Sequence, residues 1–482
     1  MSIFAHITDP TDLSALRTAI AAAPAPDRLV PLEIAALEIG PEAYVSVVRH
    51  LADLLADVDK DLGTSTVLVL GDTTPIFRES DNLKDSVVAM LAGVTTVKTA
   101  YLGESGHLFV DDVALEAATD AATDVDAVVS VGSGTITDIA KVATERVGGI
   151  PLVVVQTAAS VDGFTDNVSV ILRDGAKRTV PSRWPNVVLA DTTVIRTAPV
   201  ELNTAGLGET LSLYTAPADW WLAARIGMDD SFHETPRDLL LEFAGNPATW
   251  SVGLSQGNPV AIDQLTKVLA IRGMGTGIAG TTACLSGVEH VISHMLDMYA
   301  AGNHLPLGLH GAQVGVASLV AAAAWNHLRT KLTSGVRLEI PHENVLKAAV
   351  EDAFADLDST GRLGQECWSD YSSKLRTFLS LKPQAMEILV EWVQSPEKLD
   401  AIVPDTHALA HSLAVSGSPQ TISDLGDWVT DEVWSWAVGN CHLMRNRFTV
   451  VDLLEFLGWW TEDDRNQVIN EARQAGAHKV VL

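Results

Sequence analysis

The chain has 482 residues, a length that favours two domains, and its hydrophobic fraction of 47% allows a sizeable core. The 32 Lys and Arg residues against 61 Asp and Glu give a net charge of -29, which disfavours nucleic acid and anionic membranes as partners. Three widely spaced cysteines without a Cys-x-x-Cys pair indicate a reducing compartment, and the first ten residues do not resemble a signal peptide. We therefore expect a cytoplasmic protein, without nucleic-acid partners and without membrane insertion.

Short β-branched runs alternate with helical patterns over the first 199 residues. The runs lie at 66–70, 126–132, 151–157 and 186–191, and the clearest helical patterns lie at 81–91 and 137–147. This alternation predicts a parallel sheet with helices on its faces. A hairpin is expected at 169–182, where Asp174-Gly175 favours a tight turn. We predict an α/β domain over 1–199.

Helix-forming residues dominate the chain after Pro199, and the β-branched runs fade. This composition predicts an all-α second domain over 200–482. Helices are expected at 205–224, 260–279, 288–300, 311–328, 342–354, 431–445 and 449–457, with an extra helix inside 230–251. The most apolar stretch, 315–325, is shorter than the roughly 20 residues that a membrane-spanning helix needs.

A glycine turn follows the second predicted strand, in "VVSVGSGTITDIAK" (128–141). Gly132 and Gly134 let the backbone approach a ligand, and Ser133, Thr135 and the first free helical amides could bind a phosphate. The pattern is not GxGxxG, so an ordinary strand-to-helix turn is the alternative. Its place in a β-α alternation favours a nucleotide pyrophosphate.

Two further segments at strand ends carry polar side chains. Asp72 ends an earlier strand and could hold a ribose hydroxyl, although a lone carboxylate also suits a simple turn. "QTAASVDGFTDN" (156–167) offers Thr157, Ser160 and Asp162 at the end of a strand where parallel sheets bind ligands. An Asx turn at Asp162 is the alternative for this loop.

Histidines in the helical half suggest a metal site. His290 and His294 are four residues apart, so their rings lie on one helix face, with Asp297 nearly a turn further. They could bind one metal together, or they could be hydrogen-bonded polar residues. A catalytic divalent metal usually takes three protein ligands and keeps a position open. Glu209, His290 and His310 would meet that need.

The order of five motifs adds a family resemblance. "GSGTITDIAK", "TAASVDG", "GLGE", "SGVEHVISHMLDM" and "LHGAQVGV" resemble the sn-glycerol-1-phosphate dehydrogenases, in particular the bacterial arabinose-operon type. These enzymes belong to the superfamily of iron-containing alcohol dehydrogenases and dehydroquinate synthases. The resemblance covers about 66–459. It implies a dehydroquinate synthase-like fold, in which a Rossmann-like nucleotide-binding domain precedes a helical domain.

The resemblance also implies a reaction, which is reduction of dihydroxyacetone phosphate to sn-glycerol 1-phosphate with NADH or NADPH. A divalent metal (zinc, nickel or iron) and a homodimer or larger homo-oligomer are expected. The implied cofactor contacts are Gly132, Ser133, Gly134, Thr135 and Ile136 at the pyrophosphate, Thr157, Ser160 and Asp166 elsewhere, with Asp72 added from its own position. The implied metal ligands are Glu209, His290 and His310, and the implied substrate contacts are Asp162 and His294.

Four positions differ from the pattern of that family. Glu209 replaces aspartate, Asp166 and Val288 replace serine, and Ala312 replaces glutamate. Three alternatives therefore stay open. They are a different polyol dehydrogenase, a sugar-phosphate cyclase on the same fold, and a catalytically weakened homologue that binds nucleotide.

Overall fold

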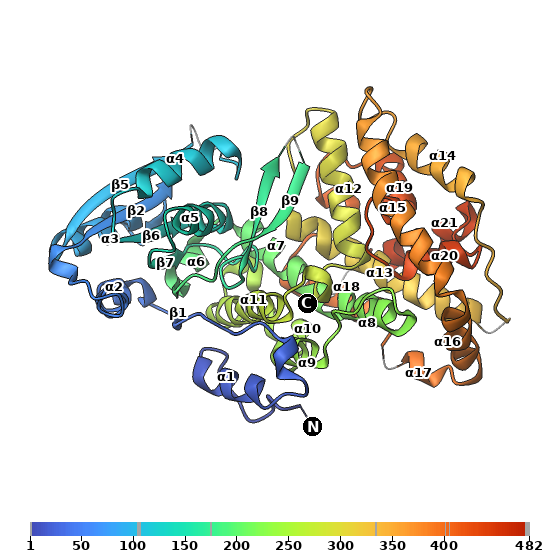
Figure 1. Cartoon of the computed structure of the whole chain (residues 1–482), viewed down its shortest axis with the longest axis horizontal. Helices are drawn as coiled ribbons and strands as arrows, with labels where there is room; N and C mark the ends of the chain where they lie inside the picture. The colour runs from blue at the N-terminus through green and yellow to red at the C-terminus, as the bar shows by residue number, and fades with distance from the viewer. Residues whose placement is uncertain are drawn as a thin grey trace. The chain divides into compact units, whose positions relative to one another are not determined.

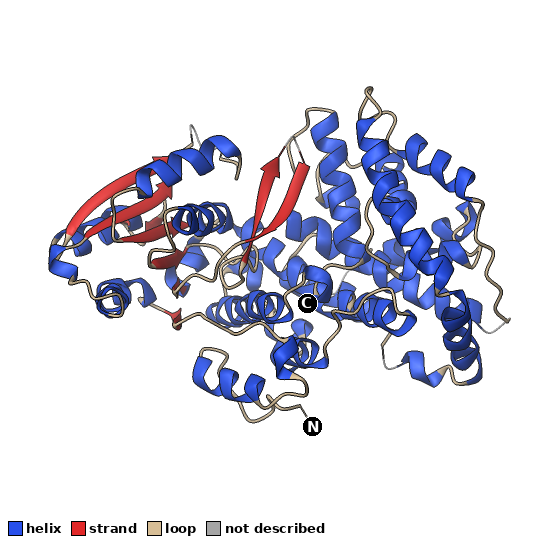
Figure 2. Cartoon of the chain, in the orientation of Figure 1, coloured by secondary structure: helices blue, strands red, loops and turns tan. Residues whose placement is uncertain are grey.

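The computed structural model describes residues 2–103, 108–173, 176–332, 335–400, 402–403 and 405–477. The chain divides into two compact units. The first contains Met1–Gly206 and Thr235–Gly280, and the second contains Leu207–Glu234 and Thr281–Leu482. Figure 1 shows the chain by residue number, and Figure 2 shows its helices and strands. The sequence places the domain boundary at 199/200 and assigns 260–279 to the helical domain, whereas here that segment belongs to the first unit.

A six-stranded parallel sheet forms the centre of the first unit, as the sequence predicts. Its strand order is β1-β10-β7-β6-β2-β5. The strands are β1 (Ala36–Gly40), β2 (Thr66–Asp72), β5 (Thr96–Leu102), β6 (Ala127–Gly132), β7 (Leu152–Gln156) and β10 (Val187–Asp191). The three strands β6, β7 and β10 are buried along their whole length, which explains their unbroken apolar runs.

The two edge strands of this sheet, β1 and β5, escaped sequence prediction. In β5 every residue is exposed or half-buried, and Thr and Lys stand among the apolar residues. Edge strands are partly solvated and carry such mixed sequences. Because β1 contains only one buried residue, Leu37, its apolar signal is equally weak.

Helices cover both faces of the sheet. The core of one face joins α2 (Val47–Ala56), α3 (Leu83–Ala92) and α6 (Thr192–Thr197) to alternate residues of the central strands. On the other face, α4 (Asp112–Ala122) and α5 (Gly134–Arg146) pack against each other and against the strands. Figure 1 shows α4 and α2 on opposite sides of the strands.

The carboxyl ends of β2, β6 and β7 form one edge of the sheet. Gly132 pairs with Gln156 and Gly71 pairs with Val131, so three adjacent strands end at the same level. From β2 the chain proceeds outward to β5 and then returns to β6 and β7 on the other side. This reversal between β2 and β6 is the switch point where open α/β sheets bind ligands.

The remaining elements of the first unit include two small antiparallel pairs. They are β3 (Phe77–Arg78) with β4 (Asp81–Asn82), and β8 (Val168–Arg173) with β9 (Ala176–Pro181). The pair β8–β9 confirms the predicted hairpin, although its Asp174-Gly175 turn lies outside the described residues. The other helices are α1 (Leu13–Ala21), α9 (Glu234–Ala244), α10 (Pro247–Trp250) and α11 (Pro259–Ala279). Contacts of α11 with α6 and β1 explain why this helix belongs to the first unit.

The second unit consists of helices and loops, without a strand among its described residues, as Figure 2 shows. Two long helices, α12 (Val288–Gly302) and α13 (His310–Lys331), pack against each other at its centre. Around them lie α8 (Ala216–Ile226), α14 (Glu343–Ala353), α15 (Arg362–Ser380), α16 (Lys382–Gln394), α17 (Glu397–Asp400), α18 (Thr406–Ser416), α19 (Asp431–Asn440), α20 (Val450–Phe456) and α21 (Glu462–Gly476). None of the described helices combines the length and the apolarity that crossing a bilayer requires.

Candidate active site

Three predicted metal ligands come together within the second unit. Glu209 lies near the end of α7 (Val200–Thr210), His290 lies in the first turn of α12, and His310 is the first residue of α13. One ligand atom from each lies within 4.8 Å of the others. The Nε2 atoms of His290 and His310 are 3.2 and 3.8 Å from the two carboxylate oxygens of Glu209. One carboxylate and two imidazoles suit zinc, nickel or iron.

Glycines explain how Glu209 reaches the two histidines. A Cβ added at Gly208 would lie 2.1 Å from the carbonyl oxygen of Gly311, and one added at Gly315 would lie 2.7 Å from the Cα atom of Gly208. The backbones of α7 and α13 therefore touch at this point, which only residues without a side chain allow. Because Gly208 precedes Glu209 and Gly311 follows His310, this contact sets the carboxylate beside the imidazole.

A second carboxylate, that of Glu289, holds the outer side of His290. Its Oε1 atom lies 2.9 Å from Nδ1 of His290 and accepts a hydrogen bond from the Gly287 amide, and Oε2 accepts one from the Thr215 hydroxyl. Burial alone would lower the pKa of His290, but the carboxylates of Glu209 and Glu289 outweigh it and raise the pKa to about 9. The two carboxylates around the His290 ring thus favour a positive charge at this position, which a metal cation would also supply.

Asp219 anchors the start of α12 and so the backbone next to His290. One carboxylate oxygen accepts a hydrogen bond from the Val288 amide, and the other accepts from the Val450 amide and the Trp325 indole. Burial, with a smaller effect of the nearby Glu289 charge, raises the pKa of Asp219 to about 8. Sequence reasoning missed Asp219 and the role of Glu289, because nothing near Asp219 in sequence points to α12.

His294 and Asp297 do not belong to the three-residue group. The ring centroid of His294 lies 5.6 Å from that of His310, with the two planes tilted by 32°. His294 is thus a neighbour of one candidate ligand, and its contact with substrate stays a prediction. Asp297 is buried further along α12.

In the first unit, the glycine turn forms the start of α5. Ser133 is the extended residue before the helix, and its side chain makes no capping hydrogen bond. A Cβ added at Gly134 would lie 2.7 Å from a methyl carbon of Val161, so the turn packs closely on the next loop. The amide of Thr157 also donates to the carbonyl of Gly132. The structure thus places the glycine turn next to the loop that carries Thr157 and Ser160, and the cofactor contacts of both segments stay predictions.

Asp72 lies at the same edge of the sheet. Its carboxylate is 2.8 Å from Nζ of Lys84, whose ammonium also donates to the carbonyl oxygen of Thr74. A quarter of the Asp72 side chain (25%) remains exposed, so it can still accept a hydrogen bond from a ligand. The predicted contact with a ribose stays a prediction.

A buried lysine fixes the loop that carries Asp162 and Asp166. Lys141 of α5 lies 2.6 Å from Asp166 and 3.0 Å from Asp138, and it donates to the carbonyl oxygen of Gly163. The structure thus turns the Asp166 carboxylate, predicted as a cofactor contact, toward a buried ammonium group. Burial and the neighbouring Asp138 and Asp162 charges outweigh Lys141 and raise the pKa of Asp166 to about 7.

Helix α11 holds the same loop from another direction. The Nε atom of Arg272, whose side chain is 1% exposed, lies 3.2 Å from the carboxylate of Asp162. The Thr165 hydroxyl donates to the carbonyl of Ala270. Asp162, the predicted substrate contact, is therefore oriented by a buried guanidinium, and 20% of its side chain remains exposed.

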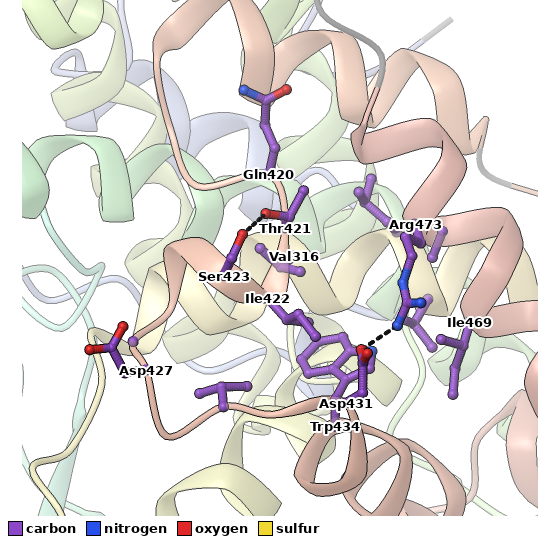
Figure 3. A pocket seen from close by; sticks show the side chains of 15 residues that line it. Val316, Gln420, Thr421, Ile422, Ser423, Asp427, Asp431, Trp434, Ile469 and Arg473 are labelled. Carbon is purple, nitrogen blue, oxygen red and sulfur yellow. Dashed lines mark hydrogen bonds and ion pairs between the residues drawn. The ribbon is translucent and has the colours of Figure 1, made fainter.

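A separate pocket of about 600 Å³ lies among α13, α19 and α21 of the second unit. Figure 3 shows the side chains that line it, among them the apolar Trp434 and Ile469 and the ion pair of Asp431 with Arg473. None of the three candidate metal ligands lines this pocket. Its size alone does not make it the active site, because the convergent donor groups lie elsewhere.

Comparison with known proteins shows the family of the chain. The sequence pattern of the iron-containing alcohol dehydrogenases matches residues 43–199. The glycerol-1-phosphate dehydrogenase [NAD(P)+] of Haloquadratum walsbyi is 35% identical over 271 residues, which cover 54% of this chain and 76% of the relative. That of Halorubrum lacusprofundi is 36% identical over 51% of this chain, and the alignment spans 65% of the relative, just under two thirds. That of Bacillus velezensis is 25% identical over 69% of this chain and 71% of the relative.

Solved structures share the fold. A probable glycerol dehydrogenase from Sinorhizobium meliloti 1021 has a TM-score of 0.54 and 15% identity, covering 92% of this chain and 96% of its own. The glycerol dehydrogenase from Schizosaccharomyces pombe has a TM-score of 0.54 and 16% identity, and the match covers 92% of this chain and 88% of that chain. Together with the sequence relatives, these findings confirm the predicted fold class and resemblance. The chain belongs to the glycerol-1-phosphate dehydrogenase family of NAD(P)-linked oxidoreductases, within the iron-containing alcohol dehydrogenases.

Gly208→Ala tests the close contact beneath the metal set. The new methyl group would meet the backbone of Gly311, so the helices must separate. We expect a loss of about 1–3 kcal/mol in the free energy of unfolding and a lower content of bound metal. Gly93→Ala is the control, because a Cβ there meets its nearest atom at an ordinary 3.5 Å. Equal urea unfolding curves and equal metal content for the two variants would contradict the contact.

Asp166→Asn tests the buried carboxylate. Because the pKa of Asp166 is raised to about 7 in the folded state, the unfolded chain loses this proton at lower pH. The Asp166 carboxyl therefore lowers the free energy of unfolding as pH rises from about 4 to about 7. Above about 7 it is ionised in both states and changes the free energy of unfolding no further. Between pH 5 and pH 8, the free energy of unfolding of wild type should fall by on the order of 2 kcal/mol more than that of Asp166→Asn. Urea unfolding at both pH values measures this, and an equal loss in both proteins refutes it.

Proposed function

We propose that the protein catalyses the reversible reduction of dihydroxyacetone phosphate to sn-glycerol 1-phosphate with NADH or NADPH, using one divalent metal. The observation that carries this proposal is the set of Glu209, His290 and His310, whose ligand atoms converge within 4.8 Å in a chain of this family. The proposal treats zinc, nickel and iron as equal candidates, since all three accept this donor set.

The second unit would activate the ketone. A bound divalent ion would polarise the carbonyl oxygen and stabilise the negative charge that develops there. His310 keeps 24% of its side chain exposed, which leaves an approach for substrate on its side of the set. His294 lies next to His310 and would deliver the proton that the new hydroxyl group needs.

The first unit would hold the nucleotide. The turn from Gly132 to Ile136 would bind the pyrophosphate at the start of α5, where unpaired amides and the helix dipole favour anions. Thr157 and Ser160 would contact the cofactor further along, and Asp72 would accept from a ribose hydroxyl. Asp162 would orient the substrate. The reduced nicotinamide held there would supply hydride, which together with one proton would convert the ketone to the secondary alcohol.

Two departures from the family pattern do not remove a metal donor. Val288 and Ala312 are 1% and 7% exposed, and each lies two residues from a candidate ligand histidine inside a helix. The Val288 amide still donates to Asp219. The third, Glu209, still offers a carboxylate. This geometry favours an active metal enzyme over a weakened homologue, while a polyol dehydrogenase and a sugar-phosphate cyclase remain the alternatives for substrate.

We also infer a cytoplasmic homo-oligomer, a homodimer or larger. Support for the compartment comes from Cys284, Cys367 and Cys441, which are buried and form no disulfide. Sedimentation velocity measures the oligomeric state.

Metal reconstitution tests the proposed reaction. Protein stripped of metal is reloaded with zinc, nickel or iron, and oxidation of NADH and NADPH is followed with dihydroxyacetone phosphate. We expect metal-dependent oxidation that falls by about 100-fold or more in His290→Ala, together with loss of the bound metal. If NADH or NADPH is oxidised only with the ketone of an unphosphorylated polyol, the protein is the alternative polyol dehydrogenase. NADH binding without net oxidation with any metal, but with turnover of a sugar phosphate, supports the cyclase.

His294→Ala separates proton delivery from metal binding. Because His294 lies outside the ligand group, we expect this variant to retain wild-type metal content while kcat falls by roughly 100-fold. His411→Ala, an exposed histidine on α18, is the control and should match wild type. Elemental analysis and steady-state kinetics provide the two measurements. Loss of metal in His294→Ala would make His294 a ligand instead.

A further inference from the structure

The ring of His310 is held on the side away from Glu209 by a neutral pair of side chains. Its Nδ1 atom lies 2.9 Å from the hydroxyl oxygen of Ser293 on α12. That hydroxyl donates a hydrogen bond of 2.7 Å to Oε1 of Gln313 on α13. Ser293 and Gln313 are both 0% exposed, so water does not compete for these bonds.

The direction of these bonds determines where the proton of His310 resides. A hydroxyl group has one proton, and in Ser293 it is given to Gln313. The Ser293 oxygen therefore accepts from His310, so the ring proton is on Nδ1 and Nε2 carries the lone pair. Nε2 is the atom that faces Glu209. A metal bound at this set requires that lone pair.

The orientation of the Gln313 amide is what selects this arrangement. If the amide nitrogen faced Ser293, it would donate, and the Ser293 proton would turn to Nδ1 of His310. The ring proton would then be on Nε2, where it would block a metal. In the structure the amide nitrogen has no hydrogen-bond partner among the described residues. It points toward Gly308, where an added Cβ would lie 2.6 Å from it.

His290 is held differently. Its Nδ1 atom faces the Glu289 carboxylate, which can only accept when ionised, so the proton position on this ring needs no further group. The two candidate ligands thus have unlike supports, one charged and one neutral. The neutral support of His310 depends on two residues acting in series, so it is the one that a single substitution can reverse.

We propose that Ser293 and Gln313 are positioning residues that fix the metal-binding tautomer of His310. This inference rests on the proposed metal centre and adds to it the residues that prepare one ligand. Neither side chain is assigned to the metal or the substrate. Their effect is therefore on metal affinity, which can be measured in the absence of cofactor and substrate.

Four variants test the pair. Ser293→Ala removes the acceptor for the ring proton, and Gln313→Met removes the acceptor that orients the Ser293 hydroxyl. Gln313→Glu keeps an oxygen acceptor of the same length. Ser318→Ala is the matched control. Ser318 lies on α13 and is fully buried like Ser293, but its hydroxyl donates only to the carbonyl oxygen of Val314. The zinc dissociation constant is measured for each by competition with a chromophoric chelator, and the melting temperature is measured without metal.

We expect Ser293→Ala and Gln313→Met to bind zinc about 10- to 100-fold more weakly than wild type, with Gln313→Glu and Ser318→Ala unchanged or tighter. Equal affinities for Ser293→Ala and Ser318→Ala overturn the inference. If Ser293→Ala melts at a much lower temperature, the Gln313 variants decide, since equal affinities for Gln313→Glu and Gln313→Met also overturn it. Failure of wild type and Ser318→Ala to bind zinc, nickel or iron would instead refute the proposed function.

Discussion

The buried carboxylate of Glu209 is the interaction on which the candidate site depends. A carboxylate taken out of water is costly unless a positive charge or several donors lie beside it. Two imidazoles meet it here, its side chain is only 4% exposed, and the close contact between Gly208 and Gly311 sets its backbone beside α13. The divalent ion that we propose would resolve this arrangement, because it would neutralise the carboxylate and use the lone pairs of both rings. The same demand explains why Asp219 and Glu289 hold the start of α12 so firmly: small shifts of His290 would separate the donors.

Much of the fold could be predicted because burial leaves a strong signal in sequence. The central strands β6, β7 and β10 are buried throughout and carry unbroken apolar runs, whereas β1 and β5 are partly exposed and carry none. In the second unit α12, α13, α14, α19 and α20 were predicted, whereas α15, α16, α17, α18 and α21 were not. The unit to which α11 belongs was not predicted from sequence. Most residues of this helix are buried, so its sequence does not reveal which elements it packs against.

The site shows the same contrast at the level of single residues. Glu209, His290 and His310 were predicted as metal ligands from residue type, spacing and family resemblance. Their supports were not, because Asp219, Ser293 and Gln313 become meaningful only when helices distant in sequence are brought together. Asp166 shows the opposite case. Its position in a ligand-binding loop suggested a cofactor contact, and only the structure reveals that the buried ammonium of Lys141 holds its carboxylate.

Charge balance explains the unlike supports of the two histidines. Glu209 and Glu289 together bring two negative charges, which a divalent ion would balance. Asp219 adds little at neutral pH, because its raised pKa of about 8 keeps it mostly protonated. A third carboxylate behind His310 would leave the centre negative, and a substrate that carries phosphate would be repelled from a protein whose net charge is already -29. Ser293 and Gln313 can fix the proton on His310 without adding charge, so a neutral pair suits the phosphorylated substrate that we propose.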